Sequence, residues 1–159
     1  MKTIKYIIVE DEPWAHVALL ELMKIYPDFI CIGQFYDGRE AQNFLLVNTP
    51  DLVFLDINIP SINGFDLLRS IKRKFNAIIT TGHSDYAVDS FGLSAIDYLM
   101  KPISPDRLEF AINKVLDKIY LANDLQSYKS KYYNINFENN KEFDFIEILI
   151  VHGTVIKIY

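Results

Sequence analysis

The sequence has a single cysteine, Cys31, among its 159 residues. One thiol cannot form an internal disulfide, and it also excludes a structural zinc site made of cysteines alone. This cysteine usage suits a reducing compartment, so we expect a cytoplasmic protein. Cys31 itself lies in the apolar run Phe29–Phe35, where it fits a core position better than the position of a nucleophile.

Glycine is also scarce, and its six residues are scattered along the chain. Neither G-x-x-x-x-G-K-[ST] nor G-x-G-x-x-G occurs, so no glycine-rich loop is available to hold nucleotide phosphates. Long apolar runs are absent too. The first run ends at Glu10-Asp11-Glu12, too early for a signal peptide, and none reaches the roughly 20 residues of a membrane-spanning helix. We expect neither a nucleotide-binding protein nor a membrane protein.

Positive charge is in deficit, because 16 Lys and Arg residues stand against 21 Asp and Glu, for a formal net charge of −5. This balance does not indicate a nucleic-acid-binding surface in the chain as given. Apolar residues, in contrast, make up 50% of the sequence and aromatic residues 14%, enough to bury a sizeable core. The length fits one domain with room for the start of a second.

Short apolar runs alternate with segments of helical periodicity along most of the chain. The predicted strands cover residues 4–9, 29–35, 52–56, 77–81 and 96–100. The predicted helices cover residues 15–25 after Pro13, 37–48 with Asp37 as the cap, 65–74, 85–92, and a segment that begins near 104. Nearly continuous apolar strands are typical of a parallel sheet covered on both faces. The sequence therefore predicts an open, doubly wound α/β domain whose ligand site lies beyond the carboxyl ends of the strands.

Apolar spacing also predicts the buried faces of two helices. For the first helix the predicted face is Ala18, Leu19, Leu22 and Ile25. For the last helix it is Leu108, Ala111, Ile112, Val115 and Ile119.

The composition changes after Leu121. Residues 122–142 are rich in Asn, Lys, Ser, Tyr and Glu, which indicates a helix extension or a linker. In residues 143–159, two apolar runs flank His152-Gly153, a pattern typical of a hairpin. Because a lone hairpin is only marginally stable, this tail suggests the incomplete start of a second, β-type domain. The predicted organisation is a main domain over 1–121, a helix extension or linker over 122–142, and the incomplete start of a second domain over 143–159.

Polar side chains follow the predicted strands at one edge of the sheet. Glu10 and Asp11 follow the first strand, Asp56 ends the third, Thr81 ends the fourth and Lys101 follows the fifth. Three clustered carboxylates repel one another unless a cation neutralises them, and oxygen ligands with open water positions suit Mg²⁺. An Asp beside Mg²⁺ can accept a phosphoryl group, while an ammonium and a hydroxyl hold its oxygens. The set predicts a phosphoryl-accepting site.

Four motifs resemble, in order and spacing, those of response-regulator receiver domains. They are Ile-Ile-Val-Glu-Asp-Glu-Pro (7–13), Leu-Asp-Ile-Asn-Ile-Pro-Ser-Ile-Asn-Gly-Phe (55–65), Thr-Thr-Gly-His (80–83) and Asp-Tyr-Leu-Met-Lys-Pro (97–102). The resemblance covers about residues 3–121. It implies a flavodoxin-like receiver fold, with five parallel strands in the order 2-1-3-4-5.

The resemblance implies an acceptor and a set of metal ligands. Asp56 would be the phosphoacceptor, Asp11 a direct Mg²⁺ ligand and Glu10 a ligand acting through water. The backbone carbonyl of Asn58 would complete the ligands from the protein. Glu10 departs from the family pattern, in which Asp is commoner at this position, and its longer side chain puts the metal shell there in doubt.

The resemblance also implies residues that respond to the phosphoryl group. Thr81 and Lys101 would hold its oxygens, and Lys101-Pro102 would be joined by a cis peptide bond. Tyr98 would be the switch residue, with a rotamer that follows Thr81, although simple packing at the sheet edge is the alternative. His83 either tunes the lifetime of the aspartyl phosphate or is a solvated loop residue.

Two further stretches resemble regulators of the LytTR family. They are Ser84-Asp85-Tyr86-Ala87 together with Ala95-Ile96-Asp97-Tyr98-Leu99, and residues 143–158, which resemble the first hairpin of the LytTR DNA-binding domain. This resemblance implies a transcription regulator that accepts phosphate from a sensor histidine kinase and forms a homodimer when phosphorylated. DNA would be bound only through the remainder of the C-terminal domain, most of which lies outside this chain.

Two other functions fit parts of the same pattern. A phosphatase with an aspartyl nucleophile needs an Asp two residues later as general acid, but that position is Asn58, which cannot donate and recover a proton. We therefore expect a signalling domain with slow self-dephosphorylation and not a turnover enzyme. A receiver-like scaffold that never binds phosphate is the second alternative, and the intact set of acidic residues, Thr81 and Lys101 argues against it.

Overall fold

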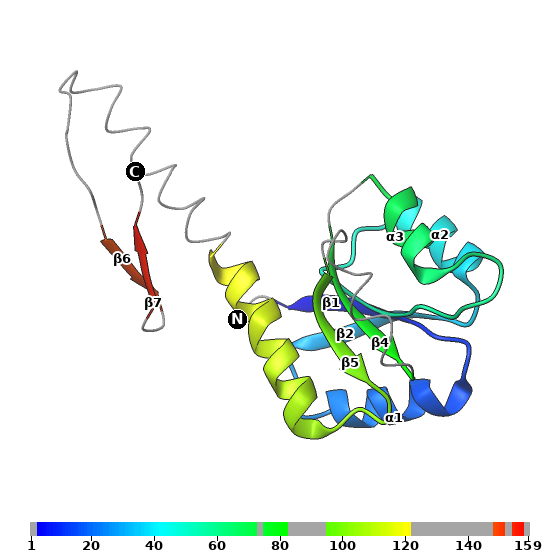
Figure 1. The fold of residues 1–159 in the computed structure, drawn as a ribbon, viewed down its shortest axis with the longest axis horizontal. Helices are drawn as coiled ribbons and strands as arrows, with labels where there is room; N and C mark the ends of the chain where they lie inside the picture. The colour runs from blue at the N-terminus through cyan, green and yellow to red at the C-terminus, as the bar shows by residue number, and fades with distance from the viewer. Residues whose placement is uncertain (1–2, 73–74, 83–94, 122–147, 152–153, 158–159) are drawn as a thin grey trace, which may run out of the picture. The chain divides into compact units, whose positions relative to one another are not determined.

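The computed structural model describes residues 3–72, 75–82, 95–121, 148–151 and 154–157. Five parallel strands form one sheet in the order β2-β1-β3-β4-β5. The sheet is drawn in Figure 1. The strands are β1 (Ile4–Val9), β2 (Phe29–Phe35), β3 (Leu52–Asp56), β4 (Asn76–Thr81) and β5 (Ala95–Met100). The predicted doubly wound parallel fold and its strand order are confirmed.

Burial follows the position of each strand in the sheet. All five residues of the central strand β3 are buried, whereas β2 at the edge alternates between buried or half-buried and exposed positions. This difference explains the sequence pattern, because a central strand covered by helices on both faces has no exposed side that would need polar residues. Because the strands are parallel, the carboxyl ends of β1, β3, β4 and β5 lie at the same edge of the sheet.

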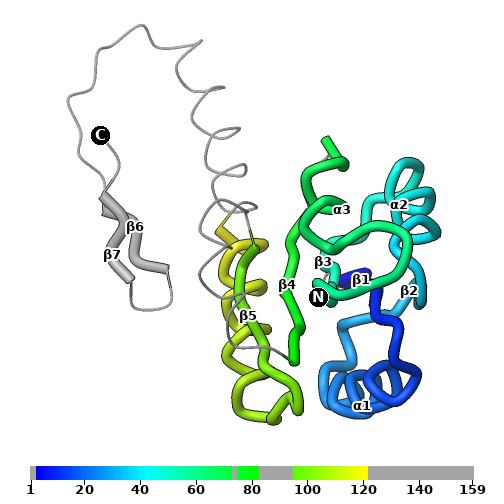
Figure 2. The backbone as a smooth tube through the Cα atoms, turned by 45° about the vertical axis from the view of Figure 1, so that its right-hand side comes forward, coloured from blue at the N-terminus to red at the C-terminus, as the bar shows by residue number. Residues whose placement is uncertain are grey.

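Among the helices that cover the sheet in the described residues are α1 (Pro13–Met23), α2 (Gly38–Val47) and α3 (Gly64–Ser70). Figure 2 shows α2 and α3 on the opposite side of the sheet from α1. A core cluster joins α2 and α3 to β1 and β3, with Ala41, Leu45, Leu67, Val9 and Leu55 among its members. A further helix covers residues 105–121.

Side-chain caps fix where two of these helices begin. The Asp37 carboxylate accepts hydrogen bonds from the backbone N–H groups of Arg39 (2.7 Å) and Glu40 (3.2 Å) at the start of α2, as predicted. Asn63 Oδ1 accepts from the N–H of Phe65 (2.9 Å) at the start of α3. Because the first N–H groups of a helix have no partner within it, these caps set the register of both helices.

The predicted buried face of α1 is wrong in part. Pro13 is at the first helical position as predicted, but α1 ends at Met23, and Ile25 is 71% exposed beyond it. The buried residues are His16, Leu19 and Met23, while Ala18 is exposed. The error arose because α1 has apolar residues on all sides, so apolar spacing alone did not indicate which side meets the sheet.

Other helix predictions have mixed outcomes. α3 ends at Ser70, short of the predicted residue 74. In the helix over 105–121, four predicted core residues are buried, namely Leu108, Ala111, Ile112 and Val115, and Ile119 is half-buried. The predicted helix at 85–92 lies outside the described residues.

The C-terminal segment contains an antiparallel hairpin of β6 (Ile148–Val151) and β7 (Thr154–Lys157). Its pairing runs from Ile148 with Lys157 to Val151 with Thr154, which confirms the predicted hairpin. The chain divides into two compact units, Met1–Val115 and Leu116–Tyr159. The predicted boundary at residue 121 stays a prediction, and the predicted linker at 122–142 lies almost wholly outside the described residues. Within the described part of the chain, no helix has the length and apolar character needed to cross a membrane.

Candidate functional site

The predicted site residues meet at the carboxyl edge of the sheet. Glu10 follows β1, Asp56 ends β3 and Thr81 ends β4, and their exposed fractions are only 3%, 4% and 1%. Asp11 is exposed to solvent beside them. One carboxylate oxygen from each of Glu10, Asp11 and Asp56 lies within 4.8 Å of the others. The structure therefore brings the three predicted carboxylates into one cluster.

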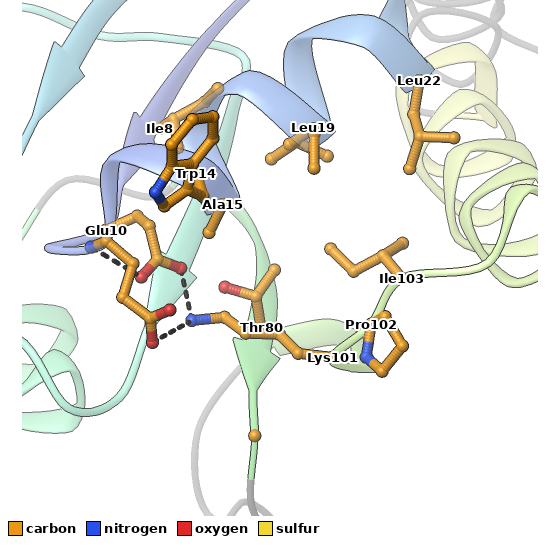
Figure 3. Close-up of a pocket in the computed structure, with 13 residues that line it drawn as sticks. Ile8, Glu10, Trp14, Ala15, Leu19, Leu22, Thr80, Lys101, Pro102 and Ile103 are labelled. Atoms are coloured by element: carbon orange, nitrogen blue, oxygen red, sulfur yellow. Dashed lines mark hydrogen bonds and ion pairs between the residues drawn. The ribbon is translucent and has the colours of Figure 1, made fainter.

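Lys101, which follows β5, bridges two of these carboxylates. Its Nζ lies 2.6 Å from Glu10 Oε2 and 2.6 Å from Asp56 Oδ2, and 3.9 Å from Glu12 Oε1. Figure 3 shows the Lys101 ammonium directed at the Glu10 carboxylate from the other side of the site. A single ammonium thus neutralises part of a buried anionic cluster, and its hydrogen bonds to both carboxylates are charge-assisted.

Burial and charge shift the pKa values of Glu10 and Lys101. Burial raises the pKa of Glu10 from 4.5 to about 7, and the nearby Asp56 charge adds to the rise, while Lys101 opposes it. Burial alone would lower the pKa of Lys101, but its hydrogen bonds to Asp56 and Glu10 and their charges raise it overall. Lys101 therefore stays an ammonium, whereas burial favours the protonated form of Glu10.

The backbone around Asp56 is held by close packing against α3. The N–H of Asn58 donates to Asp56 Oδ1 (3.2 Å), and the N–H of Gly64 donates to the carbonyl of Ile57 (2.9 Å). A Cβ at position 64 would come within 2.4 Å of the Asp56 carbonyl oxygen. Glycine is required here because any side chain would displace the backbone that carries Asp56.

The ends of β4 and β5 are joined on the other side of Asp56. The N–H of Lys101 donates to the carbonyl of Thr81 (2.8 Å), and the Lys101-Pro102 peptide bond is cis, as the family resemblance implied. The Tyr98 side chain packs against the core cluster of α2 and α3, and its buried hydroxyl has no hydrogen-bond partner in the described part of the chain. His83 lies outside the described residues.

The site opens into a pocket of about 470 Å³ between α1 and the segment after β5. Apolar side chains of α1, including Leu19 and Leu22, face Pro102 and Ile103 across it, as Figure 3 shows. Trp14, at the rim, is 83% exposed. Glu10 and Lys101 therefore border a pocket that has an apolar wall.

His16 is a residue of this site that the sequence interpretation missed. Its Nε2 lies 2.6 Å from the carbonyl oxygen of Glu10, and the side chain is 1% exposed. In the structure, His16 precedes the buried Leu19 and Met23 by three and seven residues, which is the spacing of one helix face. This spacing places His16 on the buried face of α1, in the turns that follow the acidic loop.

Comparison with known proteins identifies the family. Residues 6–113 match the family model described as the response regulator receiver domain. The chain belongs to this family. The receiver match covers the sheet from Tyr6 onward and all of the clustered site residues described above.

Curated relatives are similar to this receiver over most of its length. It is 38% identical over 131 residues to the sensory transduction protein LytR of Staphylococcus haemolyticus, a match that covers 80% of this chain and 51% of that protein. It is 36% identical over 115 residues to the transcriptional regulatory protein LytR of Staphylococcus aureus, covering 70% of this chain and 47% of that protein. The chain thus spans about half the length of the curated relatives it matches.

Solved structures share the receiver fold. The response regulatory domain of mrkE from Klebsiella pneumoniae superposes with a TM-score of 0.67 at 35% identity, over 72% of this chain and 97% of that one. The response regulator domain of CheB from Thermotoga maritima gives a TM-score of 0.61 at 25% identity, over 76% of this chain and 96% of that one. Both support the sheet order described above.

Proposed function

We propose that this receiver accepts a phosphoryl group from a sensor histidine kinase on Asp56. The observation that carries the proposal is the Lys101 ammonium, 2.6 Å from both Asp56 Oδ2 and Glu10 Oε2 at the end of the sheet. Asp56 is buried, and its carboxylate accepts a hydrogen bond from the backbone N–H of Asn58. The carboxylate is also paired with the Lys101 ammonium, which can pair instead with an incoming anion. The exposed Asp66 on α3, which pairs with Arg69, lacks this surrounding.

The acidic cluster fits Mg²⁺. Three carboxylates with oxygens within 4.8 Å of one another form the hard, oxygen-only donor set that this ion prefers. Glu10, Asp11 and Asp56 would hold it, together with the backbone carbonyl of Asn58. When bound, Mg²⁺ would neutralise the cluster and stabilise negative charge on the transferring oxygens.

The residues of the chain would then carry out the transfer. A carboxylate oxygen of Asp56 attacks the phosphorus atom, the bond from phosphorus to the kinase histidine nitrogen breaks, and that nitrogen keeps the electron pair. Lys101 moves from the carboxylates to the phosphoryl oxygens, to which it remains paired as a point charge. The hydroxyl of Thr81, at the end of the neighbouring strand, donates a hydrogen bond to another of these oxygens.

The output of the domain would follow from Tyr98. Its side chain packs against the core cluster of α2 and α3, and a change at Thr81 would shift its rotamer. We propose that phosphorylation favours a homodimer and that transcription is controlled by a LytTR-type domain in the remainder of the protein. The relative named as the transcriptional regulatory protein LytR supports the control of transcription.

Turnover catalysis is not part of the proposal. Asn58 stands two residues after the acceptor, where a phosphatase would need an acid, and its side chain cannot shuttle a proton. Only slow self-dephosphorylation is expected. We also propose a cytoplasmic location, since the single cysteine suits a reducing compartment and a kinase donor would act there.

The mass of the intact protein after incubation with acetyl phosphate tests the proposal. With MgCl₂ the wild type should gain one phosphoryl group, and EDTA should prevent the gain. Asp56→Asn should gain none, because an amide oxygen is too weak a nucleophile. Asp66→Asn, which changes an exposed carboxylate that pairs with Arg69, is the matched control and should be phosphorylated like the wild type. A gain of equal size in Asp56→Asn would refute the assignment of the acceptor.

A further inference from the structure

His16 contacts the backbone of the acidic loop from inside the protein. It lies on α1, its side chain is 1% exposed, and its Nε2 is 2.6 Å from the carbonyl oxygen of Glu10. A carbonyl oxygen can only accept a hydrogen bond, so His16 Nε2 carries the hydrogen and donates it. This contact joins the helix that follows the acidic loop to the first residue of that loop.

Glu10 is therefore anchored on both sides of its Cα atom. Its N–H donates to the carbonyl of Phe35 on β2 (2.9 Å), and its carbonyl accepts from His16 (2.6 Å). The carbonyl belongs to the peptide group that links Glu10 to Asp11. Fixing that oxygen fixes the peptide plane, and with it the directions in which both carboxylates leave the backbone.

The His16 ring is itself held in place. Its centroid lies 4.2 Å from that of the Tyr36 ring, with the planes inclined by 33°. Nδ1 is buried and has no hydrogen-bond partner in the part of the chain that the structure describes. A buried polar atom without a partner costs stability, and an apolar side chain at this position would avoid that cost. The hydrogen bond to Glu10 is what a histidine supplies here and a leucine does not.

We propose that His16 is a positioning residue for the metal site. Its Nε2–H orients the Glu10-Asp11 peptide group so that both carboxylates point at a common ion. This inference rests on the proposed function, because it takes Glu10 and Asp11 as Mg²⁺ ligands. Groups that hydrogen-bond to the ligands of a metal commonly change its affinity by about 10- to 100-fold when they are removed.

The test is the dissociation constant for Mg²⁺ alone, measured by calorimetric titration of the full chain with MgCl₂ and no phosphodonor. His16→Gln keeps an N–H donor at a similar reach, whereas His16→Leu and His16→Met fill the volume without a donor. We expect His16→Gln to bind Mg²⁺ within about threefold of wild type, and the other two to bind at least about 10-fold more weakly. Rescue by Gln but not by Leu or Met would separate the hydrogen bond from packing.

A variant that is destabilised at another position shows whether weaker Mg²⁺ binding comes from lost stability alone. Met23 is 3% exposed on the same helix face, and Met23→Ala should lower the melting temperature while leaving the Mg²⁺ dissociation constant of the folded protein unchanged. The proposal is overturned if folded His16→Leu or His16→Met binds Mg²⁺ as tightly as wild type, or if His16→Gln binds as weakly as they do.

The same titration separates failure of this inference from failure of the metal site. If Asp11→Asn binds Mg²⁺ as well as wild type does, the acidic cluster is not the metal site, and the part of the proposed function that places Mg²⁺ there is wrong. If Asp11→Asn is impaired but His16→Leu is not, the metal site stands and only the role of His16 is wrong.

Discussion

At the scale of single residues, the site depends on one ammonium shared by two buried carboxylates. Lys101 Nζ is 2.6 Å from an oxygen of Glu10 and of Asp56, and its side chain is 17% exposed. Without this cation the two carboxylates would face each other in a region of low dielectric, where their repulsion is strong. The same ammonium is the group best placed to follow negative charge onto an incoming phosphoryl group.

Replacing Lys101 by methionine should therefore slow phosphorylation. Loss of a charged donor to the transferring oxygens should reduce the rate with acetyl phosphate by about 100-fold or more. The rate is measured from the intact mass at timed intervals in MgCl₂. Lys24→Met, which removes an exposed lysine paired with Glu21, is the control and should react at the wild-type rate. Equal rates for the two variants would show that Lys101 takes no part in the transfer.

Glu10 should make the stability of the protein depend on pH in the absence of metal. Because its pKa is raised from 4.5 to about 7, the folded state binds its proton more tightly than the unfolded state does. The contribution of the raised Glu10 pKa to the free energy of unfolding is fully present below pH 4.5 and is lost as the pH rises through about 7. In EDTA, the free energy of unfolding of wild type should fall between pH 5 and pH 8 relative to that of Glu10→Gln, as measured by urea denaturation. Parallel curves for the two proteins would contradict the raised pKa.

Which residues gather at the site could be predicted at this scale only in part. Glu10, Asp56 and Lys101 were found because each directly follows or ends an apolar strand, and strand ends meet in a parallel sheet. His16 was not found, because its contact with the Glu10 carbonyl depends on which side of α1 faces the sheet. That orientation is a property of packing and is not visible in a helix with apolar residues on all sides.

At the scale of elements, the loop between β3 and α3 determines where Asp56 lies. Gly64 brings the first turn of α3 against the Asp56 backbone, and the N–H of Gly38 at the start of α2 donates to the carbonyl of Pro60 (3.1 Å). The Ser61 hydroxyl donates to the Asp37 carboxylate, and Ser61 has a positive φ of 69°. The loop is thereby held at both of its sides, so Asp56 has little freedom to move.

Gly64→Ala should destabilise the domain. The added Cβ would lie 2.4 Å from the Asp56 carbonyl oxygen, which is backbone and cannot move aside like a flexible side chain. Overpacking of this kind costs about 1–3 kcal/mol, measurable as a lower midpoint of urea unfolding. At Gly82 a Cβ would meet no atom of the described residues within 4 Å, so Gly82→Ala is the matched control and should unfold close to wild type. A wild-type midpoint for Gly64→Ala would show that the loop can relax.

Element boundaries were predictable where a strong local signal exists. The bounds of β2 and β3 and the Asp37 cap of α2 agree with the prediction because apolar runs and capping residues act locally. The end of α3 was placed too far along the chain, since Ile71 is buried but has an extended backbone, with ψ of 111°. An apolar residue after a helix continues the helical pattern in sequence even where the chain has already left the helix.

At the scale of the whole molecule, the order of the strands was implied by family resemblance and not by the spacing of apolar residues. Alternating strands and helices predict a parallel sheet, but many strand orders satisfy that pattern. The motifs at 7–13, 55–65 and 97–102 selected the receiver order, which the structure and the family match confirm. The C-terminal hairpin pairs as its two apolar runs predicted, while its membership of a DNA-binding domain remains a proposal.

The central claim is that Asp56 carries the phosphoryl group, and its most direct test is the position of the modification. Full-length protein is phosphorylated with acetyl phosphate and MgCl₂, reduced with borohydride to convert an aspartyl phosphate to homoserine, and digested for peptide sequencing by mass spectrometry. The account predicts homoserine at position 56 alone, and none when MgCl₂ is replaced by EDTA. Homoserine at Asp11 or at any other acidic residue, with Asp56 unchanged, would contradict it.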